Sequence, residues 1–293
     1  MKQPFFSICI PVYNMAGTIG LSVESVLRQT CDDWELVIVD DCSTDGTWEL
    51  LCQKYSNHSK ISLHRNEKNL KQWGNLNRCI QLAIGEWIGF LPADDTYRLH
   101  ALETVKREVS LDESVILWMH AHLCHGEGVV TNIVPVFNHI TKFMSDELAE
   151  ILYLQGNIFG ELSSFFISKK NINICFRDCL GAPDLDFYVR LLRANPQGQC
   201  VYWPDALALV LQHPNSISST ETKSGRVYAM VLDSIGELGA LGWRYPIVLR
   251  QYLRAMAFFL RRYARIPGRR WSLLTQNLRS IKVLRENPLK TAK

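Results

Sequence analysis

Apolar and polar residues alternate along the first 110 positions in a way that predicts strands and helices in turn. Short continuous apolar runs predict buried strands, and apolar residues spaced three and four apart predict amphipathic helices. The segment 18–29, for example, places Ile19, Val23 and Val26 on one helical face. The predicted strands are residues 5–12, 34–39, 61–64 and 86–91, and the predicted helices are residues 18–29, 44–55, 74–84 and 99–109. This alternation indicates an α/β fold with a mostly parallel central sheet and helices on both faces.

The pattern is less regular beyond residue 110. The predicted elements are strands at residues 115–123, 163–168 and 200–211 and an amphipathic helix at residues 184–194. Residues 124–180 otherwise mix short helices, and past about residue 219 the chain is helical and basic. We therefore expect one main domain and a C-terminal basic helical extension. The expected boundaries are residues 1–219 for the domain, in halves 1–110 and 111–219, and residues 220–293 for the extension.

The composition fits a globular protein. The chain has 293 residues, of which 47% are hydrophobic, so it can bury a full core. We expect no signal peptide, because the N-terminus lacks a sustained apolar helix and a small-residue cleavage site. No apolar stretch approaches the ~18 residues that span a bilayer. Nine scattered cysteines without a C-x-x-C pair predict reduced thiols in a cytoplasmic protein.

The net charge of +3 conceals an asymmetry. Residues 244–293 contain thirteen Lys and Arg against one acid, Glu286, whereas residues 1–243 contain nineteen bases and twenty-eight acids. Within the basic segment, four arginines between positions 250 and 265 share one helical face, opposite aromatic and aliphatic residues. This pattern predicts binding to an anionic membrane surface, and a helix packed on the main domain is the alternative. No nucleic-acid-binding motif accompanies the charge, so nucleic acid is not an expected partner.

Acidic residues follow two of the predicted strands. Asp40 and Asp41 end the strand at residues 34–39, and Asp94 and Asp95 follow the strand at residues 86–91. Ligands bind beyond the carboxyl ends of strands in open α/β sheets, and carboxylates there accept hydrogen bonds from a base N–H, from ribose hydroxyls or from metal-bound water. A single pair of adjacent aspartates is more simply explained as a solvent-exposed turn. Two pairs at such strand ends favour a nucleoside site with a hard divalent cation, Mg²⁺ or Mn²⁺.

Together with these acids, further motifs resemble the family 2 glycosyltransferases of the GT-A fold. The matching stretches are residues 7–14 (Ser-Ile-Cys-Ile-Pro-Val-Tyr-Asn), 40–47, 66–70, 74–79, 84–91 and 94–95, and the similarity returns at residues 181–190 and 207–218. The resemblance implies an inverting glycosyltransferase of the hexosyltransferase type (EC 2.4). It implies a nucleotide-diphosphate sugar as donor, with a UDP-sugar favoured, and a glycan hydroxyl as acceptor.

The resemblance also implies roles for individual residues in the donor site. The residues expected to contact the donor nucleotide are Pro11, Tyr13, Asn14, Asp41, Lys71, Arg78 and Asp94. Asp95 and His213 are expected to hold Mn²⁺ or Mg²⁺. The sequence departs from the family at Pro92, where many members carry an Asp, and at Leu211, where members commonly carry an Arg.

Residues 181–190 resemble the segment that supplies the catalytic base. Asp184 matches the carboxylate that takes the proton from the acceptor hydroxyl, with Asp186 and Arg190 in support. One-step displacement would invert the anomeric centre. Pro183 stands where the family usually has Glu. A purely structural interpretation stays open, in which Asp184 caps the helix and Asp186 forms an i,i+4 pair with Arg190.

The resemblance implies a cellular setting as well. Bacterial relatives commonly build O-antigen, capsule or exopolysaccharide units, which implies a lipid-linked glycan acceptor and a peripheral location at the inner face of the cell membrane. The alternatives are a polyprenyl-phosphate glycosyltransferase of the same fold and a catalytically degenerate membrane-associated scaffold.

Two other enzyme classes fail on the sequence. An aspartate-nucleophile phosphohydrolase needs Asp-x-Asp at the strand end, but Cys42 follows Asp40 by two positions and Ser43 follows Asp41 by two. A dinucleotide oxidoreductase needs a glycine-rich first turn, which residues 13–17 lack. The histidines at positions 120, 122 and 125 and Cys124 have no second ligand cluster with zinc spacing. His120, His122 and Cys124 share one face of a strand, which predicts a polar strand face bordering the acceptor cleft.

Overall fold

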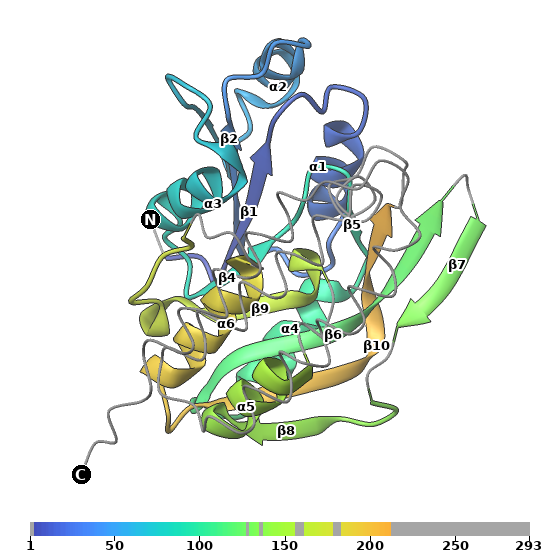
Figure 1. Ribbon diagram of the computed structural model, residues 1–293. Helices are drawn as coiled ribbons and strands as arrows, with labels where there is room; N and C mark the ends of the chain where they lie inside the picture. Colours follow the sequence, from blue (N-terminus) through green and yellow to red (C-terminus); the bar gives the residue numbers. More distant parts are fainter. Residues whose placement is uncertain (1–2, 127–128, 135–136, 156–160, 178–182, 212–293) are drawn as a thin grey trace, which may run out of the picture. The chain divides into compact units, whose positions relative to one another are not determined.

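A computed structural model describes residues 3–126, 129–134, 137–155, 161–177 and 183–211 (Figure 1). These residues belong to two compact units. The first contains the described residues up to Leu148 together with residues 161–176 and 190–211, and the second contains residues 149–155, 177 and 183–189. The expected C-terminal extension, residues 220–293, lies outside the described residues. Within them, no helix has both the length and the apolar character needed to cross a bilayer.

The first unit carries all the described strands, and two helices, Ser145–Gln155 and Pro183–Ala194, have residues in both units. The strands are β1 (Phe6–Val12), β2 (Trp34–Asp40), β3 (Ile61–Arg65), β4 (Trp87–Phe90), β5 (Thr96–Tyr97), β6 (Val115–Gly126), β7 (Val129–Val134), β8 (Thr141–Met144), β9 (Phe165–Ser168) and β10 (Gln199–Leu211). The helices are α1 (Ile19–Leu27), α2 (Thr47–Tyr55), α3 (Lys71–Leu82), α4 (Ala101–Val109), α5 (Ser145–Gln155) and α6 (Pro183–Ala194), with short 3-10 helices η1 (Leu162–Ser164) and η2 (Lys169–Asn171).

The strands form one mixed sheet in the order β3-β2-β1-β4-β9-β6-β10-β5, with β7 beside β6 and β8 beside β10. The four strands from β1 to β4 are parallel, as the alternating pattern predicted. Antiparallel pairs enter where β9 inserts between β4 and β6. The chain runs from β1 outward to β3 and then returns to β4 on the other side of β1. The carboxyl ends of β1 and β4 therefore flank a topological switch point, where open α/β sheets bind ligands.

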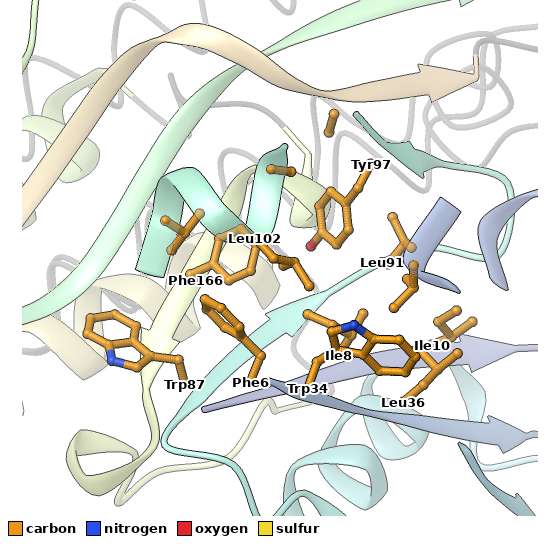
Figure 2. Close-up of a cluster of buried hydrophobic side chains, with 14 of the residues drawn as sticks. Phe6, Ile8, Ile10, Trp34, Leu36, Trp87, Leu91, Tyr97, Leu102 and Phe166 are labelled. Atoms are coloured by element: carbon orange, nitrogen blue, oxygen red, sulfur yellow. The ribbon is translucent and has the colours of Figure 1, made fainter. Parts of the chain in front are cut away.

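Alternate residues of the central strands face opposite layers of helices. Ile8 and Ile10 of β1 belong to a buried cluster that includes Val23 of α1 and Leu102 of α4. On the other face, Cys9 meets Cys79 of α3. Figure 2 shows the cluster, in which the Phe166 ring lies 5.7 Å from those of both Phe6 and Tyr97. Burying each such side chain contributes about 1.5–3 kcal/mol, and this core fixes the strand ends that carry the acidic loops.

Several element boundaries differ from the sequence prediction. Helix α2 begins at Thr47 rather than 44, because the carboxylate of Asp45 accepts hydrogen bonds from the N–H and hydroxyl of Thr47 and holds residues 43–46 in a turn. Helix α3 begins at Lys71, three residues before the predicted start. The predicted strand at residues 163–168 begins at Phe165, because Leu162–Ser164 form η1. The sequence did not predict β5, β7 or β8 as separate strands.

Candidate active site

The loops after β1 and β2 are joined into one surface at the carboxyl edge of the sheet. The N–H of Asn14 donates to the hydroxyl of Ser43 (2.9 Å), and the side-chain oxygen of Asn14 accepts from the N–H of Thr44 (2.8 Å). The N–H of Ala16 donates to Asp45 (3.0 Å). Asn14, predicted to contact the nucleotide, therefore holds the loop, and its contact with a ligand stays a prediction. Its neighbour Tyr13 is 45% exposed, so its ring is open to a ligand.

Asp41 is buried and receives two hydrogen bonds on one oxygen. Its Oδ1 accepts from the side-chain amide of Asn66 (2.8 Å) and from the N–H of Leu70 (2.8 Å). Asn75 of α3 holds Asn66 in turn and donates to the carbonyl of Val39 (2.9 Å). The network fixes the carboxylate of Asp41 at the end of β2 and ties the loop before α3 to it.

Asp40 points to the other side of β2 and pairs with Arg65, which sequence reasoning missed. The Nε of Arg65 lies 3.2 Å from Oδ2 of Asp40, and its Nη2 donates to the carbonyl of Ser43 (2.9 Å). Arg65 thus holds both ends of the turn that contains Cys42. One signal could have identified Arg65: it is a basic residue at the end of a predicted strand, and the preceding predicted strand ends in two aspartates.

Three non-glycine residues of the described chain have positive φ, two in the loops after β1 and β2 and one at the first residue of α3. They are Asn14 (φ 53°), Cys42 (φ 65°) and Lys71 (φ 62°). Such conformations cost of order 1 kcal/mol each and concentrate at functional sites, where the surrounding structure holds them.

Three further residues were predicted to contact the nucleotide. Lys71 and Arg78 of α3 are both exposed, and the Nη1 of Arg78 donates to the side-chain oxygen of Gln81 (3.4 Å). Pro11 is half-buried in β1.

The second acidic pair lies in a turn that follows β4. The N–H of Asp95 donates to the carbonyl of Pro92 (3.0 Å), so Pro92 closes the turn at the position where many family members carry an Asp. The hydroxyl of Tyr97 donates to the carbonyl of Phe90 (3.1 Å) and ties the two sides of the loop together. Asp94 is half-buried, whereas Asp95 is buried.

Both oxygens of Asp95 accept hydrogen bonds from distant parts of the first unit. The hydroxyl of Ser163 donates to Oδ2 (2.8 Å), and the N–H of Leu211 donates to Oδ1 (3.1 Å). Burial, and then the nearby charge of Asp94, raise the pKa of Asp95 to about 8, although these two hydrogen bonds lower it. The negative charge of Glu161 adds to the increase. The surroundings of Asp95 therefore disfavour its ionised form.

The predicted catalytic segment forms the start of α6. Asp184 is half-buried in the first turn of that helix, within the second unit. Asp186, in the same unit, is buried and forms a two-point ion pair with Arg177, whose Nε lies 3.1 Å from Oδ2. In the first unit, Arg190 donates from Nη2 to the carbonyl of Cys175 (2.8 Å). Arg177 is a second residue that sequence reasoning missed, because nothing in its neighbourhood marks it.

Two histidines of β6, His120 and His122, are not on an open strand face. His120 is fully buried and His122 is 4% exposed, so the predicted polar face bordering a cleft is wrong for both. His120 Nδ1 lies 2.6 Å from the carbonyl of Ala121, and His122 Nδ1 lies 3.2 Å from the hydroxyl of Ser164. Burial lowers the pKa of His120 to about 4.

Comparison with known proteins decides the family. A model of the family described as "Glycosyl transferase family 2" matches residues 7–175, more than half of the chain. The chain belongs to glycosyl transferase family 2. The resemblance seen in the sequence motifs is therefore confirmed.

Two curated relatives illustrate the similarity. The PGL/p-HBAD biosynthesis glycosyltransferase of Mycobacterium bovis is 38% identical over 108 residues, which cover 36% of this chain and 41% of the relative. The putative colanic acid biosynthesis glycosyl transferase WcaA of Escherichia coli is 33% identical over 200 residues, covering 65% of this chain and 67% of WcaA. The match thus spans only about two fifths of the length of the mycobacterial relative.

Solved structures of low sequence identity establish the fold alone. TarS 1–349 of S. aureus in complex with UDP-GlcNAc superposes with a TM-score of 0.62 at 16% identity, covering 96% of this chain and 90% of that chain. The mannosyltransferase PcManGT of Pyrobaculum calidifontis, in complex with GDP-Man and Mn²⁺, gives a TM-score of 0.60 at 15% identity, covering 100% of this chain and 77% of that chain. The family 2 chain therefore has a GT-A-like α/β fold with a mixed central sheet.

The ligand atoms that the acidic pair offers fit a hard divalent cation. Asp94 and Asp95 offer only oxygen ligands, which Mg²⁺ and Mn²⁺ prefer. The described residues contain no group of three or more acids, His or Cys able to hold a metal alone, and His213 lies outside them. A cation bound through one or two carboxylates and completed by substrate phosphates needs no larger protein cluster. The pair thus suits a metal that binds together with a diphosphate.

Proposed function

We propose that this chain is a nucleotide-sugar-dependent glycosyltransferase of bacterial surface polysaccharide biosynthesis. The observation that carries the proposal is the pair of acidic loops at the topological switch point of a family 2 chain. Asp41 and Asp95 follow strands on either side of β1, and each is fixed by hydrogen bonds from the protein. The UDP-GlcNAc and GDP-Man bound by structural neighbours support nucleotide sugars as the donor class.

The hydrogen bonds of Asp41 favour uridine as the base. Guanine presents two adjacent N–H donors, which together need both oxygens of a carboxylate. Uracil presents a single N–H donor, which needs only one oxygen. The two donors on Oδ1, from Asn66 and Leu70, fill the lone-pair positions of that oxygen. Oδ2 remains for the single N–H of uracil. In this proposal Pro11, Tyr13 and Asn14 border the base, Asp94 binds the ribose, and Lys71 and Arg78 approach the phosphates.

We further propose that Asp95, together with His213, binds Mn²⁺ or Mg²⁺. The Mn²⁺ in a structural neighbour and the oxygen-only donor pair support this assignment. In the sequence, His213 follows Leu211 by two positions, and the N–H of Leu211 is bonded to Asp95. A bound cation would stabilise the negative charge on the leaving diphosphate.

Asp184 is the proposed catalytic base. A half-buried carboxylate in the first helical turn can accept the proton of an acceptor hydroxyl as that oxygen attacks the anomeric carbon. Displacement from the face opposite the diphosphate inverts the anomeric centre. The ion pair of Asp186 with Arg177, and the bond from Arg190 to Cys175, support a role for Asp186 and Arg190 in holding this segment.

The acceptor and the setting are proposals from the family resemblance. The proposed acceptor is a lipid-linked glycan, and the proposed catalytic domain covers residues 1–219. The proposed location is peripheral, at the inner face of the membrane, through residues 244–293. A polyprenyl-phosphate acceptor and a degenerate scaffold are the alternatives. Flotation with anionic liposomes tests the membrane role, because binding that survives deletion of residues 244–293 would refute it.

Release of nucleoside diphosphate from UDP-sugars in the presence of Mn²⁺ tests the proposed activity. We expect Asp184→Asn to lower turnover by about 10²-fold or more, since general base catalysis contributes that much, and Asp95→Asn to lower it and raise the Mn²⁺ requirement. Asp205→Asn, which changes an exposed carboxylate of β10, should leave the rate unchanged. Unchanged release in both site variants would overturn the assignment. Folded wild-type protein inactive with every donor and acceptor would favour the scaffold.

A further inference from the structure

The 3-10 helix η1 presents two adjacent buried serines to two different side chains. Ser163 and Ser164 are both 0% exposed. The hydroxyl of Ser163 reaches Asp95, whereas that of Ser164 meets His122 of β6. A bond from the N–H of Ser164 to the carbonyl of Glu161 (3.0 Å) closes the turn, and Phe165 then enters β9 in the centre of the sheet. The backbone of η1 is therefore fixed on both sides of Ser163.

The carboxylate of Asp95 is restrained at both oxygens by groups far away in the sequence. Ser163 lies 68 positions from Asp95 and binds Oδ2, and Leu211 lies 116 positions away and binds Oδ1. Rotation of the carboxylate about its last side-chain bond would break both hydrogen bonds. When Asp95 is ionised, each oxygen accepts one of these bonds and keeps a further lone pair, because an ionised carboxylate has about four acceptor positions. The two bonds thus select which lone pairs are available to a ligand.

From this geometry we infer that Ser163 is a positioning residue, which orients Asp95 to bind the divalent cation of the donor complex. The inference rests on the proposed function. Groups that hydrogen-bond to metal ligands fix their orientation, and losing one typically weakens metal affinity or activity 10–100-fold. The simpler interpretation is that Ser163 only satisfies a buried carboxylate. In that case its loss would lower stability and leave the affinity of the folded protein for metal unchanged.

The adjacent serine offers a matched control. Ser163→Ala removes the hydroxyl at Asp95, and Ser164→Ala removes an equally buried hydroxyl one residue away that contacts His122. Ser163→Thr keeps the hydroxyl. Ser163→Cys keeps a similar side-chain volume, but its thiol is a weaker hydrogen-bond donor to Asp95. This variant replaces Ser163→Ala in the experiment if Ser163→Ala does not fold.

Binding of Mn²⁺ in the presence of UDP, followed by the electron paramagnetic resonance signal of free Mn²⁺, is the primary readout. The half-saturating Mn²⁺ concentration for UDP release is the second. We expect Ser163→Ala to weaken both about 10-fold or more, Ser163→Thr to restore them, and Ser164→Ala to match wild type. Wild-type affinity in folded Ser163→Ala, or equal losses in the two alanine variants, would overturn the inference. Wild-type protein that binds no Mn²⁺ with UDP would instead contradict the proposed function.

Discussion

At the scale of single residues, the acids of the two loops differ in how their charge is balanced. Asp40 has the guanidinium of Arg65 beside it, and Asp41 accepts two hydrogen bonds on one oxygen. The pKa of Asp95 is raised to about 8 by burial and by Asp94. Asp95 also accepts two hydrogen bonds, but burial and Asp94 still disfavour its ionised form, and a bound cation would stabilise that form. This difference supports the proposal that Asp41 recognises the base and Asp95 binds the metal.

His120 gives the protein a pH-dependent stability. Burial holds its pKa at about 4, whereas the unfolded chain should have the ordinary histidine value of about 6.5. Between these values the unfolded state binds a proton that the folded state does not. The contribution of His120 to the free energy of unfolding should therefore fall by about 2 kcal/mol between pH 7 and pH 5, whereas Asp95, whose pKa is raised to about 8, changes it in the opposite direction. Urea unfolding of wild type and of a His120 variant at pH 7, 6 and 5 isolates the contribution of His120.

Two variants separate His120 from the rest of the titration. His120→Gln should remove this contribution, because glutamine does not titrate, so on going from pH 7 to pH 5 its free energy of unfolding should change more favourably than that of wild type, by about 2 kcal/mol. His139→Gln, which replaces an exposed histidine, should retain the contribution of His120. If the free energy of unfolding of His120→Gln changed between pH 7 and pH 5 by the same amount as that of wild type, buried His120 would not contribute to the pH dependence.

At the scale of elements, the connection between α3 and β4 depends on a close approach to β1. A Cβ on Gly85 would lie 2.5 Å from the backbone nitrogen of Ser7 and 2.6 Å from the carbonyl carbon of Phe6. Backbone cannot yield as a side chain can, so Gly85→Ala should lower the free energy of unfolding by about 1–3 kcal/mol. Gly20→Ala in α1, where a Cβ meets nothing within 4 Å, should be neutral or raise it by up to about 1 kcal/mol. Thermal unfolding compares the two, and an unchanged midpoint for Gly85→Ala would refute this packing.

Most of the regular elements and the acidic loops could be predicted from the sequence, because the residue pattern that indicates each one lies within one short stretch of the chain. The parallel strands β1 to β4 have apolar runs. Asp41 follows one such run directly, and Asp95 lies five positions after the end of β4 at Phe90. Arg65 and Ser163 could not be found in this way, since their partners lie 25 and 68 positions away. Strand β5 has two residues and is defined by its pairing with β10, so no local pattern marks it.

At the scale of the whole molecule, the loops proposed to bind the donor come from one sheet whose strands are far apart in the chain. The end of β10 returns to bind Asp95, so the second half of the sequence contributes to a loop of the first. The opposite edge of the sheet offers a different place for a ligand. A cavity of about 740 Å³ lies there, lined by residues at the strand starts that include Phe5, Trp87 and Val115.

A crystal structure of the protein with UDP and Mn²⁺ tests the central claim most directly. We predict uracil beside Asp41 and Tyr13, with Mn²⁺ coordinated by Asp95 and by the diphosphate oxygens. UDP in the cavity at the strand starts, or Mn²⁺ bound away from Asp94 and Asp95, would contradict the account.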